Sequence, residues 1–273
     1  MMYIVTGGTR GIGAAVAAQL VGEGREVAVV GRDLAAARSV AESLNRSGSG
    51  RAVAVEGELG SVAGAKAAAG RLGELGPIAA LIHNAGLWPR ARALNRDGLE
   101  ASFVVNHLAP WILNRLLHTR LLASGARVVQ VSAGLFVAGR VDLRRTPTGE
   151  DFSALRTYAD TKRANVLASR WLAARWGVSL SLVHPGVVRT GLGESGGGLL
   201  DLLMRPVKAL WLSPSEGARG PCRLATDPAL AGRGGLWYDR LDERPWPAAA
   251  EDDALGEALA QQADALAGLE PLR

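Results

Sequence analysis

Tyr158 and Lys162 are the residues whose types and spacing most directly indicate chemistry. On a helix, side chains four positions apart lie on the same face. A free phenol has a pKa of about 10 and is a poor acid or base at neutral pH. A neighbouring ammonium group favours the phenolate and brings that pKa toward the working range. The pair therefore predicts a proton-transfer centre, in which Tyr158 gives a proton to a forming alkoxide or takes one from an alcohol.

The composition of the chain supports this interpretation of Lys162. Only three of its 31 basic residues are lysines, namely Lys66, Lys162 and Lys208. A lysine at this spacing, in a chain that otherwise uses arginine, indicates that a compact ammonium group is needed there. The alternative is a lysine on a solvated helix surface.

A strand-like run approaches the same centre and ends in Ser132, Ala133 and Gly134. Its sequence, RVVQVSAGLF at residues 127–136, could carry a catalytic hydroxyl on Ser132. Adjacent residues of a strand point to opposite faces, so Ser132 and Ala133 cannot both face Tyr158 unless the strand twists at its end.

A glycine-rich segment, TGGTRGIG at residues 6–13, follows the first expected strand and opens the first helix. Gly7 allows a tight turn, Gly11 lets the backbone approach a pyrophosphate, and Gly13 lets helix and strand pack closely. The helix N-terminus then offers free N–H groups and a partial positive charge to the phosphates. The pattern predicts a dinucleotide site, with an ordinary glycine-rich loop as the alternative.

The tip of the second expected strand favours NADP(H) over NAD(H). NAD sites usually place an acidic side chain there to hold the ribose 2′-hydroxyl, and Gly31 has none. Arg32, together with Arg10 of the glycine loop, could pair with a 2′-phosphate instead. The alternative is that Arg32 is merely solvated and Asp33 caps the next helix.

Strand-like and helical segments alternate along the chain. Strands are expected at residues 3–6, 26–31, 52–56, 79–84, 127–132, 179–184 and 236–238. Helices are expected at residues 12–23, 34–45, 61–75, 98–122, 158–176 and 215–226, with one more after Glu251. This alternation predicts an α/β fold: a single doubly wound Rossmann-type domain over residues 1–273, with about seven mostly parallel strands and helices on both faces. The irregular stretch around residues 187–214 is expected to form a substrate lid.

Composition and charge indicate which partner classes and which cellular compartment the protein suits. The net charge is +5, but the basic residues are dispersed, which favours a solvated surface and an anionic cofactor site over nucleic-acid binding. The single cysteine, Cys222, allows no intramolecular disulfide and no cysteine-rich metal site. No apolar stretch reaches the roughly 18–20 residues of a membrane span. We therefore expect a cytoplasmic protein with no metal, no membrane and no nucleic-acid partner.

Taken together, these motifs resemble the short-chain dehydrogenase/reductase family. The resemblance rests on the glycine segment, the sequence HNAG at residues 83–86, Asn106, the Tyr158–Lys162 pair and PGVVRT at residues 185–190. The stretches around Asn106, Tyr158 and residue 184 look like the retinol-dehydrogenase-like branch. This branch reduces or oxidises small carbonyls and alcohols with NADP(H) or NAD(H), and family members often form homodimers or homotetramers, partly through the helices that carry Asn106 and Tyr158.

The resemblance implies a role for each matching position. Tyr158 would be the acid–base, Lys162 would tune it and hold the nicotinamide ribose, and Asn106 would anchor a water that links Lys162 to solvent. Thr190 would contact the nicotinamide amide. The implied cofactor-binding residues are Gly7, Thr9, Arg10, Gly11, Ile12, Gly13, Arg32, Glu58, Leu59, Asn84, Ala85, Gly86, Tyr158, Lys162, Pro185, Gly186, Val188 and Thr190.

Three positions depart from the family's pattern. The retinol-dehydrogenase-like branch places its catalytic serine 25 residues before the tyrosine, which is the position of Ala133 in this chain. The centre therefore lacks one hydrogen-bond donor unless Ser132, a water, a substrate hydroxyl or a residue of the lid replaces it. Glu58 stands where the family usually has Asp beside adenine, and His83 replaces the commoner Asn.

The substrate side is expected to be apolar. Trp88, Ala133, Phe136 and Trp211 follow expected strands or lie in the expected lid, and would suit a large apolar or aromatic small molecule. Each aromatic residue could equally pack the core. The leading hypothesis is an NADP(H)-dependent carbonyl–alcohol oxidoreductase. The alternatives are a family member that keeps NADP(H) for non-redox cyclisation, isomerisation or elimination, and a non-catalytic cofactor-binding protein.

Overall fold

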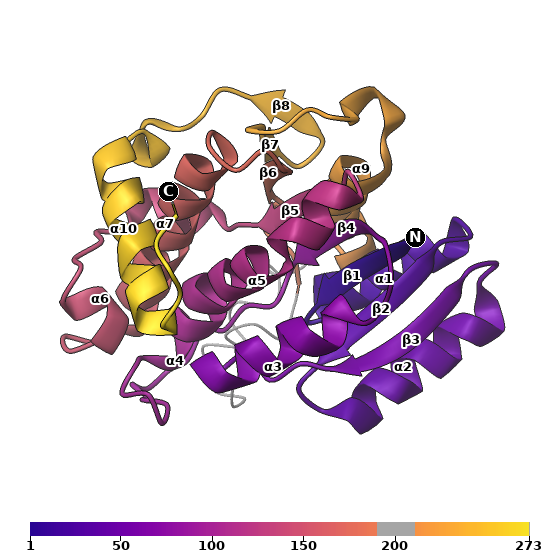
Figure 1. Ribbon diagram of the computed structural model, residues 1–273, viewed down its shortest axis with the longest axis horizontal. Coiled ribbons are helices and arrows are strands. Elements are labelled where there is room, and N and C mark those ends of the chain that lie inside the picture. The colour runs from indigo at the N-terminus through magenta and orange to yellow at the C-terminus, as the bar shows by residue number, and fades with distance from the viewer. Residues whose placement is uncertain (190–210, 273) are drawn as a thin grey trace.

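The computed structural model describes residues 1–189 and 211–272. Its centre is one sheet with the strand order β3-β2-β1-β4-β5-β6-β7-β8 (Figure 1). The first seven strands are parallel, and β8 pairs antiparallel with β7. The strands are β1 (Met2–Thr6), β2 (Glu26–Gly31), β3 (Arg51–Glu56), β4 (Ile78–His83), β5 (Arg127–Val131), β6 (Ser179–His184), β7 (Trp237–Asp239) and β8 (Asp242–Arg244).

Helices cover both faces of the sheet. The described helices are α1 (Gly11–Gly22), α2 (Leu34–Ser47), α3 (Val62–Gly73), α4 (Ala101–Phe103), α5 (Ala109–Ala123), α6 (Arg145–Thr148), α7 (Ala154–Ala173), α9 (Pro214–Thr226) and α10 (Asp253–Ala267). One apolar core lies between the sheet and α3, α5 and α7, and a second lies between the sheet and α1, α2 and α9. The doubly wound α/β arrangement predicted from the sequence is therefore confirmed, with one strand more than expected.

The continuous helix expected at residues 98–122 is interrupted. It divides into α4, a π-helical turn η1 (Val104–Leu108) that contains Asn106, and α5. A π-helical turn shifts the backbone hydrogen bonds by one residue and is often found at functional sites. Short 3₁₀ turns occur as well: η2 (Gly134–Ala138), η3 (Pro228–Leu230) and η4 (Ala248–Ala250).

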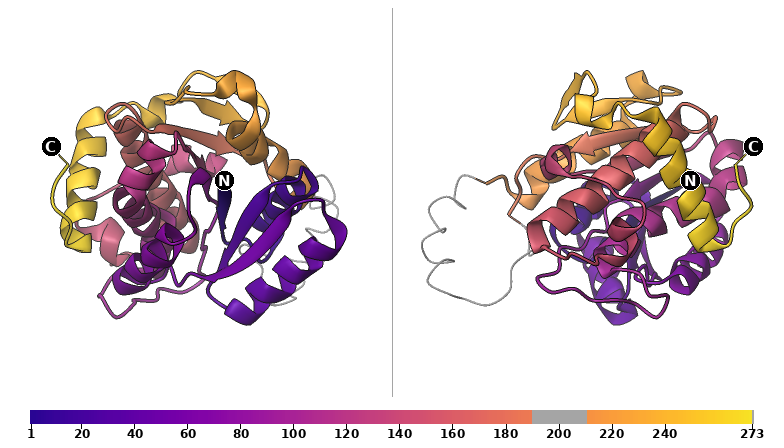
Figure 2. Two further views of the ribbon diagram at one scale, coloured as in Figure 1. Left: turned by 45° about the vertical axis from the view of Figure 1, so that its right-hand side comes forward. Right: turned by 90° about the vertical axis from the view of Figure 1, so that its left-hand side faces the viewer.

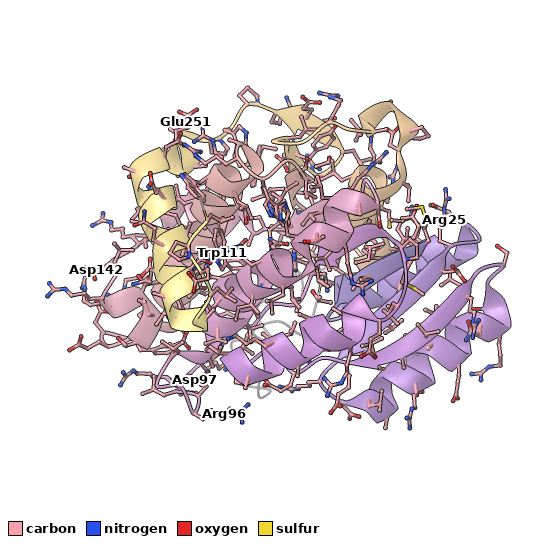
Figure 3. The ribbon with its side chains drawn as sticks, in the orientation of Figure 1. Arg25, Arg96, Asp97, Trp111, Asp142 and Glu251 are labelled. Carbon is pink, nitrogen blue, oxygen red and sulfur yellow. The ribbon has the colours of Figure 1, made fainter. Side chains whose placement is uncertain are left out.

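Helix α10 lies on the outer side of α7 and also contacts α5 (Figure 2). It is held by the buried carboxylate of Asp264, which accepts hydrogen bonds from Trp111 Nε1 at 2.8 Å and from the guanidinium of Arg115. Trp111 is labelled on α5 in Figure 3. Arg115 also donates to the carbonyl of Glu270 at 2.7 Å, so α5 and the C-terminal segment are tied at two points.

Among the residues that the structure describes, no helix is both long enough and apolar enough to cross a membrane.

Candidate active site

The side chains of Tyr158 and Lys162 are buried on one face of α7, and each is only 4% exposed. Lys162 Nζ donates a hydrogen bond to the carbonyl of Val131, the last residue of β5, at 3.2 Å. Burial raises the pKa of the Tyr158 phenol and lowers the pKa of Lys162 to about 8, because both charged forms lose their water. One of the three ammonium hydrogens forms the hydrogen bond to Val131, so the other two can donate to a ligand.

Asn106 joins the π-helical turn η1 to the loop after β4 and to α7. Its side-chain oxygen accepts from the N–H of Leu87 at 2.8 Å, and its Nδ2 donates to the carbonyl of Leu87 at 2.9 Å and to Thr161 Oγ1 at 3.0 Å. Both amide hydrogens are therefore used within the protein. Asn106 positions the walls of the site, and Thr161 is a partner that the sequence analysis missed.

Trp88 lies flat against the phenol of Tyr158. Its indole and the ring of Tyr158 are stacked with centroids 4.6 Å apart and planes 11° apart. The indole is half-buried, so the phenol covers only part of its surface.

The end of β5 buries the hydroxyl of Ser132, which the sequence analysis considered as a replacement for a catalytic serine. Ser132 is 4% exposed, and its Oγ forms no hydrogen bond with any described residue, Tyr158 included. Its N–H donates to the carbonyl of Val183 at 2.8 Å, which fixes the residue in the sheet. Ala133 is half-exposed beside it and carries no donor.

His184, at the end of β6, is a further polar residue of this region. A methyl group placed on Gly134 would lie 3.2 Å from its Nε2, so the ring lies directly beside the turn after Ala133. Its Nδ1 is buried and has no hydrogen-bond partner in the described part of the chain, and burial lowers the pKa of the ring. The sequence analysis missed His184, although its place at a strand end before Pro185 could have indicated it.

The glycine segment forms a tight turn between β1 and α1. Gly7 and Gly11 have φ of 63° and 56°, which non-glycine residues rarely adopt. A methyl group on Gly13 would meet the carbonyl oxygen of Gly7 at 2.3 Å. Asn84 secures the turn from the end of β4, because its Nδ2 donates to the carbonyls of Thr6 and Gly7 at 3.1 and 3.2 Å.

The N-terminus of α1 has no side-chain cap at Arg10, whereas Asp33 and Ser61 cap the next two helices. Uncapped N–H groups at a helix start are a ready site for phosphate groups. Asp33 accepts from the N–H groups of Ala35 and Ala36 at 2.9 and 3.1 Å, so its carboxylate is occupied as the α2 cap.

The remaining expected cofactor residues follow β3, β4 and β6. Glu58 accepts hydrogen bonds from Ser61 Oγ and the N–H of Gly60, so it braces the start of α3. Leu59 is buried in the core. Ala85 is fixed by Thr6, whose Oγ1 accepts from its N–H at 3.1 Å. Most of the expected cofactor residues belong to the described part of the chain and follow the carboxyl ends of strands. They are Gly7, Thr9, Arg10, Gly11, Ile12, Gly13, Arg32, Glu58, Leu59, Asn84, Ala85, Gly86, Pro185, Gly186 and Val188.

Part of the expected lid lies outside the described residues, and Thr190 lies there too. The flanks of this stretch are joined: the N–H of Arg189 donates to the carbonyl of Leu212, and the N–H of Leu212 donates to the carbonyl of Val187, both at 2.9 Å. Trp211 is described and half-buried.

Phe136 does not line an open pocket as the sequence predicted. It is 1% exposed and packs edge-on against Trp237 with ring centroids 5.3 Å apart, inside the core between the sheet and α7. The chain enters the turn η2 after β5, so the strand alternation that would have turned Phe136 outward no longer applies.

His83 is a core residue. Its Nε2 lies 2.8 Å from Asn114 Oδ1, and burial lowers its pKa to about 4. Within the described ranges, no three His, Cys, Asp or Glu side chains gather as a metal site.

A family profile described as short chain dehydrogenase matches residues 2–196. The chain belongs to the short-chain dehydrogenase/reductase family. It is a dehydrogenase/reductase that acts on CH–OH or C=O groups, and its relatives place it in the retinol-dehydrogenase-like branch.

Two curated relatives illustrate this place within the family. Human retinol dehydrogenase 14 is 30% identical over 97% of this chain and 86% of its own length. Mouse polyprenol dehydrogenase is 35% identical over 95% of this chain and 79% of its own length.

Solved structures of the short-chain dehydrogenase/reductase fold agree with the arrangement of the chain. An uncharacterised protein from Mycobacterium paratuberculosis superposes with a TM-score of 0.77, at 25% identity, over 99% of this chain and 95% of its own. A Beutenbergia cavernae protein, assigned as an NAD(P)-dependent gluconate 5-dehydrogenase and holding NADP at low occupancy, gives 0.69 at 26% identity, over 87% and 94%.

Proposed function

We propose that this protein uses NADP(H) to interconvert a carbonyl and an alcohol on an apolar or aromatic small molecule. The observation that carries the proposal is the buried Tyr158–Lys162 pair, whose ammonium group lies at the end of β5 and near Gly86, in the loop after β4. Lys162 Nζ is anchored on the carbonyl of Val131 at 3.2 Å, so the pair is held in place before any ligand binds.

The residues around α1 fit a nicotinamide dinucleotide. The uncapped N-terminus of α1 would face the pyrophosphate, and the close approach of Gly13 to the carbonyl of Gly7 leaves no room for a side chain at residue 13. When bound, the cofactor donates or accepts the hydride.

The preference for NADP(H) is supported by the charges at the tip of β2. Asp33 is occupied as a helix cap, and Gly31 offers no carboxylate to a ribose hydroxyl. Arg10 and Arg32 are exposed, and their side chains have no hydrogen-bond or ion-pair partner among the described residues. Two free guanidinium groups suit the 2′-phosphate that distinguishes NADP from NAD.

Tyr158 would move the proton of the reaction. In reduction its hydroxyl donates to the alkoxide oxygen, and in oxidation its phenolate accepts the alcohol proton. Burial alone raises the pKa of the phenol, so the phenolate depends on positive charge nearby. The ammonium of Lys162 supplies such charge, and its remaining hydrogens would hold the ribose.

The side chain of Ala133 offers this centre no hydrogen-bond donor. An oxyanion-type donor contributes about 2.7–4 kcal/mol, or roughly 10²–10³ in rate, so carbonyl reduction would be slow rather than absent. The buried, unpartnered Ser132 Oγ does not replace the donor in this structure. The same observation favours the alternative of a non-redox proton transfer by Tyr158 on an NADP(H)-bearing scaffold.

We further propose that the whole chain acts as one cofactor-binding domain with a substrate lid around residues 187–214, as a cytoplasmic homodimer or homotetramer. Part of the contact between copies would involve the helices that carry Asn106 and Tyr158; α10 packs against α7 and α5, while Leu116 and Leu122 of α5 stay exposed.

The test is a binding and turnover experiment. NADPH and NADH affinities are measured first, and then aldehydes and ketones are screened with wild type, Tyr158→Phe and Ala133→Ser. We expect tighter binding of NADPH, turnover that Tyr158→Phe abolishes, and equal or faster turnover with Ala133→Ser. Tight NADPH binding without turnover of any carbonyl by wild type or the serine variant would refute the redox function.

A further inference from the structure

The stacked pair of Trp88 and Tyr158 places an aromatic surface at the reacting group. The phenol covers part of the indole, with centroids 4.6 Å and planes 11° apart. Tyr158 is 4% exposed, whereas Trp88 remains partly open to solvent. A molecule whose carbonyl reaches the Tyr158 hydroxyl therefore approaches beside an indole that still has uncovered surface.

Both partners of the stack are held by one amide. Asn106 binds the N–H and the carbonyl of Leu87, the residue before Trp88. It also donates to Thr161, which lies within one turn of Tyr158 on α7. Thr161 Oγ1 in turn donates to the carbonyl of Tyr158 at 2.9 Å, so the main chain beside each ring is tied to the same amide.

Exposed apolar side chains also follow the neighbouring strands at the carboxyl edge of the sheet. Leu135 and Val137 follow β5, and Val187 follows β6, the next strand. Trp88 follows β4, on the other side of β5. Three neighbouring strand ends thus present apolar groups, and Trp88 contributes the only flat ring among these four.

We propose that Trp88 determines substrate specificity by stacking on a planar, conjugated group next to the reacting carbonyl. The proposal rests on the proposed carbonyl–alcohol function and narrows its substrate class to aryl or conjugated aldehydes and ketones. Offset aromatic stacking is worth about 0.5–1.5 kcal/mol beyond the burial of apolar area, which corresponds to a preference of roughly two- to tenfold.

The experiment compares benzaldehyde with cyclohexanecarbaldehyde, which have the same number of carbon atoms but a flat and a puckered ring. The ratio of their kcat/KM values is measured for wild type, Trp88→Ala and Trp88→Phe, because a ratio between variants cancels the intrinsic reactivity of each aldehyde. We expect Trp88→Ala to lower the ratio about two- to tenfold and Trp88→Phe to keep most of it. Leu122→Ala is the matched control: it removes an exposed apolar side chain without a ring near the end of α5, before the start of β5, and should leave the ratio unchanged.

A second readout does not need turnover. Binding of benzamide and cyclohexanecarboxamide, which are not reduced, is measured on the NADPH-loaded protein. Preference for benzamide in wild type and its loss in Trp88→Ala support the proposal. Equal binding of the two amides to wild type, binding of neither, or an unchanged ratio in Trp88→Ala would overturn it. Absent turnover with an intact amide preference would count against the proposed function alone.

The pH profile separates specificity from a general structural loss. Removing the indole re-exposes the phenol to water, so the basic limb of the reduction profile should move to lower pH in Trp88→Ala, because the pKa of Tyr158 falls toward its ordinary value. A variant that loses activity equally on both aldehydes, without such a shift, would indicate a structural role only and would contradict the proposal.

Discussion

The side chain of Asn106 forms two hydrogen bonds with the main chain of Leu87, one accepted at 2.8 Å and one donated at 2.9 Å. The amide thereby pairs with both the N–H and the carbonyl of Leu87, as a neighbouring β-strand would. Since its Nδ2 also reaches Thr161, a single side chain links the loop after β4 to the helix of Tyr158 and Lys162.

Replacing Asn106 with alanine should impair both stability and turnover. Loss of the amide leaves partly buried main-chain groups without partners, which should lower the free energy of unfolding by about 1–3 kcal/mol. It also frees Trp88 and α7 to move relative to one another, so kcat should fall. Asn114→Ala is the matched control, because Asn114 is also buried and hydrogen-bonded but contacts His83. Urea unfolding and steady-state kinetics should show a stability loss in both variants and a large kcat loss in Asn106→Ala only; an equal kcat loss would contradict this role.

Arg32→Ala should weaken NADPH binding and leave NADH binding nearly unchanged. A hydrogen bond to a charged group contributes about 1.5–3 kcal/mol, so we expect roughly a 10- to 100-fold rise in the Kd for NADPH. Arg10→Ala should act in the same direction. Arg46, also exposed but in the last turn of α2, supplies the control Arg46→Ala. Calorimetric titration measures the Kd for NADPH and for NADH in each variant. An equal loss of affinity for NADH would argue against a 2′-phosphate contact.

Asp264→Ala should strongly destabilise the fold. The carboxylate is buried and pairs with Arg115 and Trp111, so its removal leaves a partly buried guanidinium without its counter-charge, at a cost of about 3–5 kcal/mol. Asp253, on the same helix, pairs with Arg170 but is 62% exposed, so Asp253→Ala should cost less than about 1 kcal/mol. Thermal unfolding of the two variants compares them directly; similar melting temperatures would contradict the importance of the α5–α10 contact.

Stability should fall as the pH drops from about 6.5 to about 4. Burial lowers the pKa of His83 and His107 to about 4, whereas the unfolded chain titrates at 6.5. In this window the unfolded state binds more protons than the native state, so the free energy of unfolding decreases with falling pH, by up to about 3 kcal/mol for each group. His83→Asn should flatten this slope when unfolding is measured across the window. An unchanged slope in that variant would show that His83 does not contribute.

The fold was largely predictable because its signals are local. The seven parallel strands follow apolar runs, and the glycine turn is specified by residues whose backbone conformation or packing excludes other side chains. Strand β8 was missed because its three residues, Asp242–Arg244, are all charged and exposed. The π-helical turn η1 was missed as well, since a one-residue shift of backbone hydrogen bonds leaves no mark in hydropathy.

The candidate site was less predictable than the fold, because its contacts join residues far apart in the chain. The sequence placed Trp88 near the substrate but could not show that its ring stacks on Tyr158, which follows 70 residues later. It placed Phe136 in the pocket, whereas the turn after β5 directs this ring into the core. It left open which way Ser132 turns, and the structure buries its hydroxyl without a hydrogen-bond partner among residues 1–189 and 211–272.

The central claim is that the Tyr158–Lys162 centre serves hydride transfer and not a non-redox rearrangement. The most direct measurement incubates the wild-type protein with NADPH that carries deuterium at the transferable position of C4, together with an aryl aldehyde, and examines the alcohol by mass spectrometry. We predict one deuterium on the carbinol carbon, and its absence with Tyr158→Phe. Conversion of the substrate without deuterium in the product, or without oxidation of NADPH, would contradict the claim.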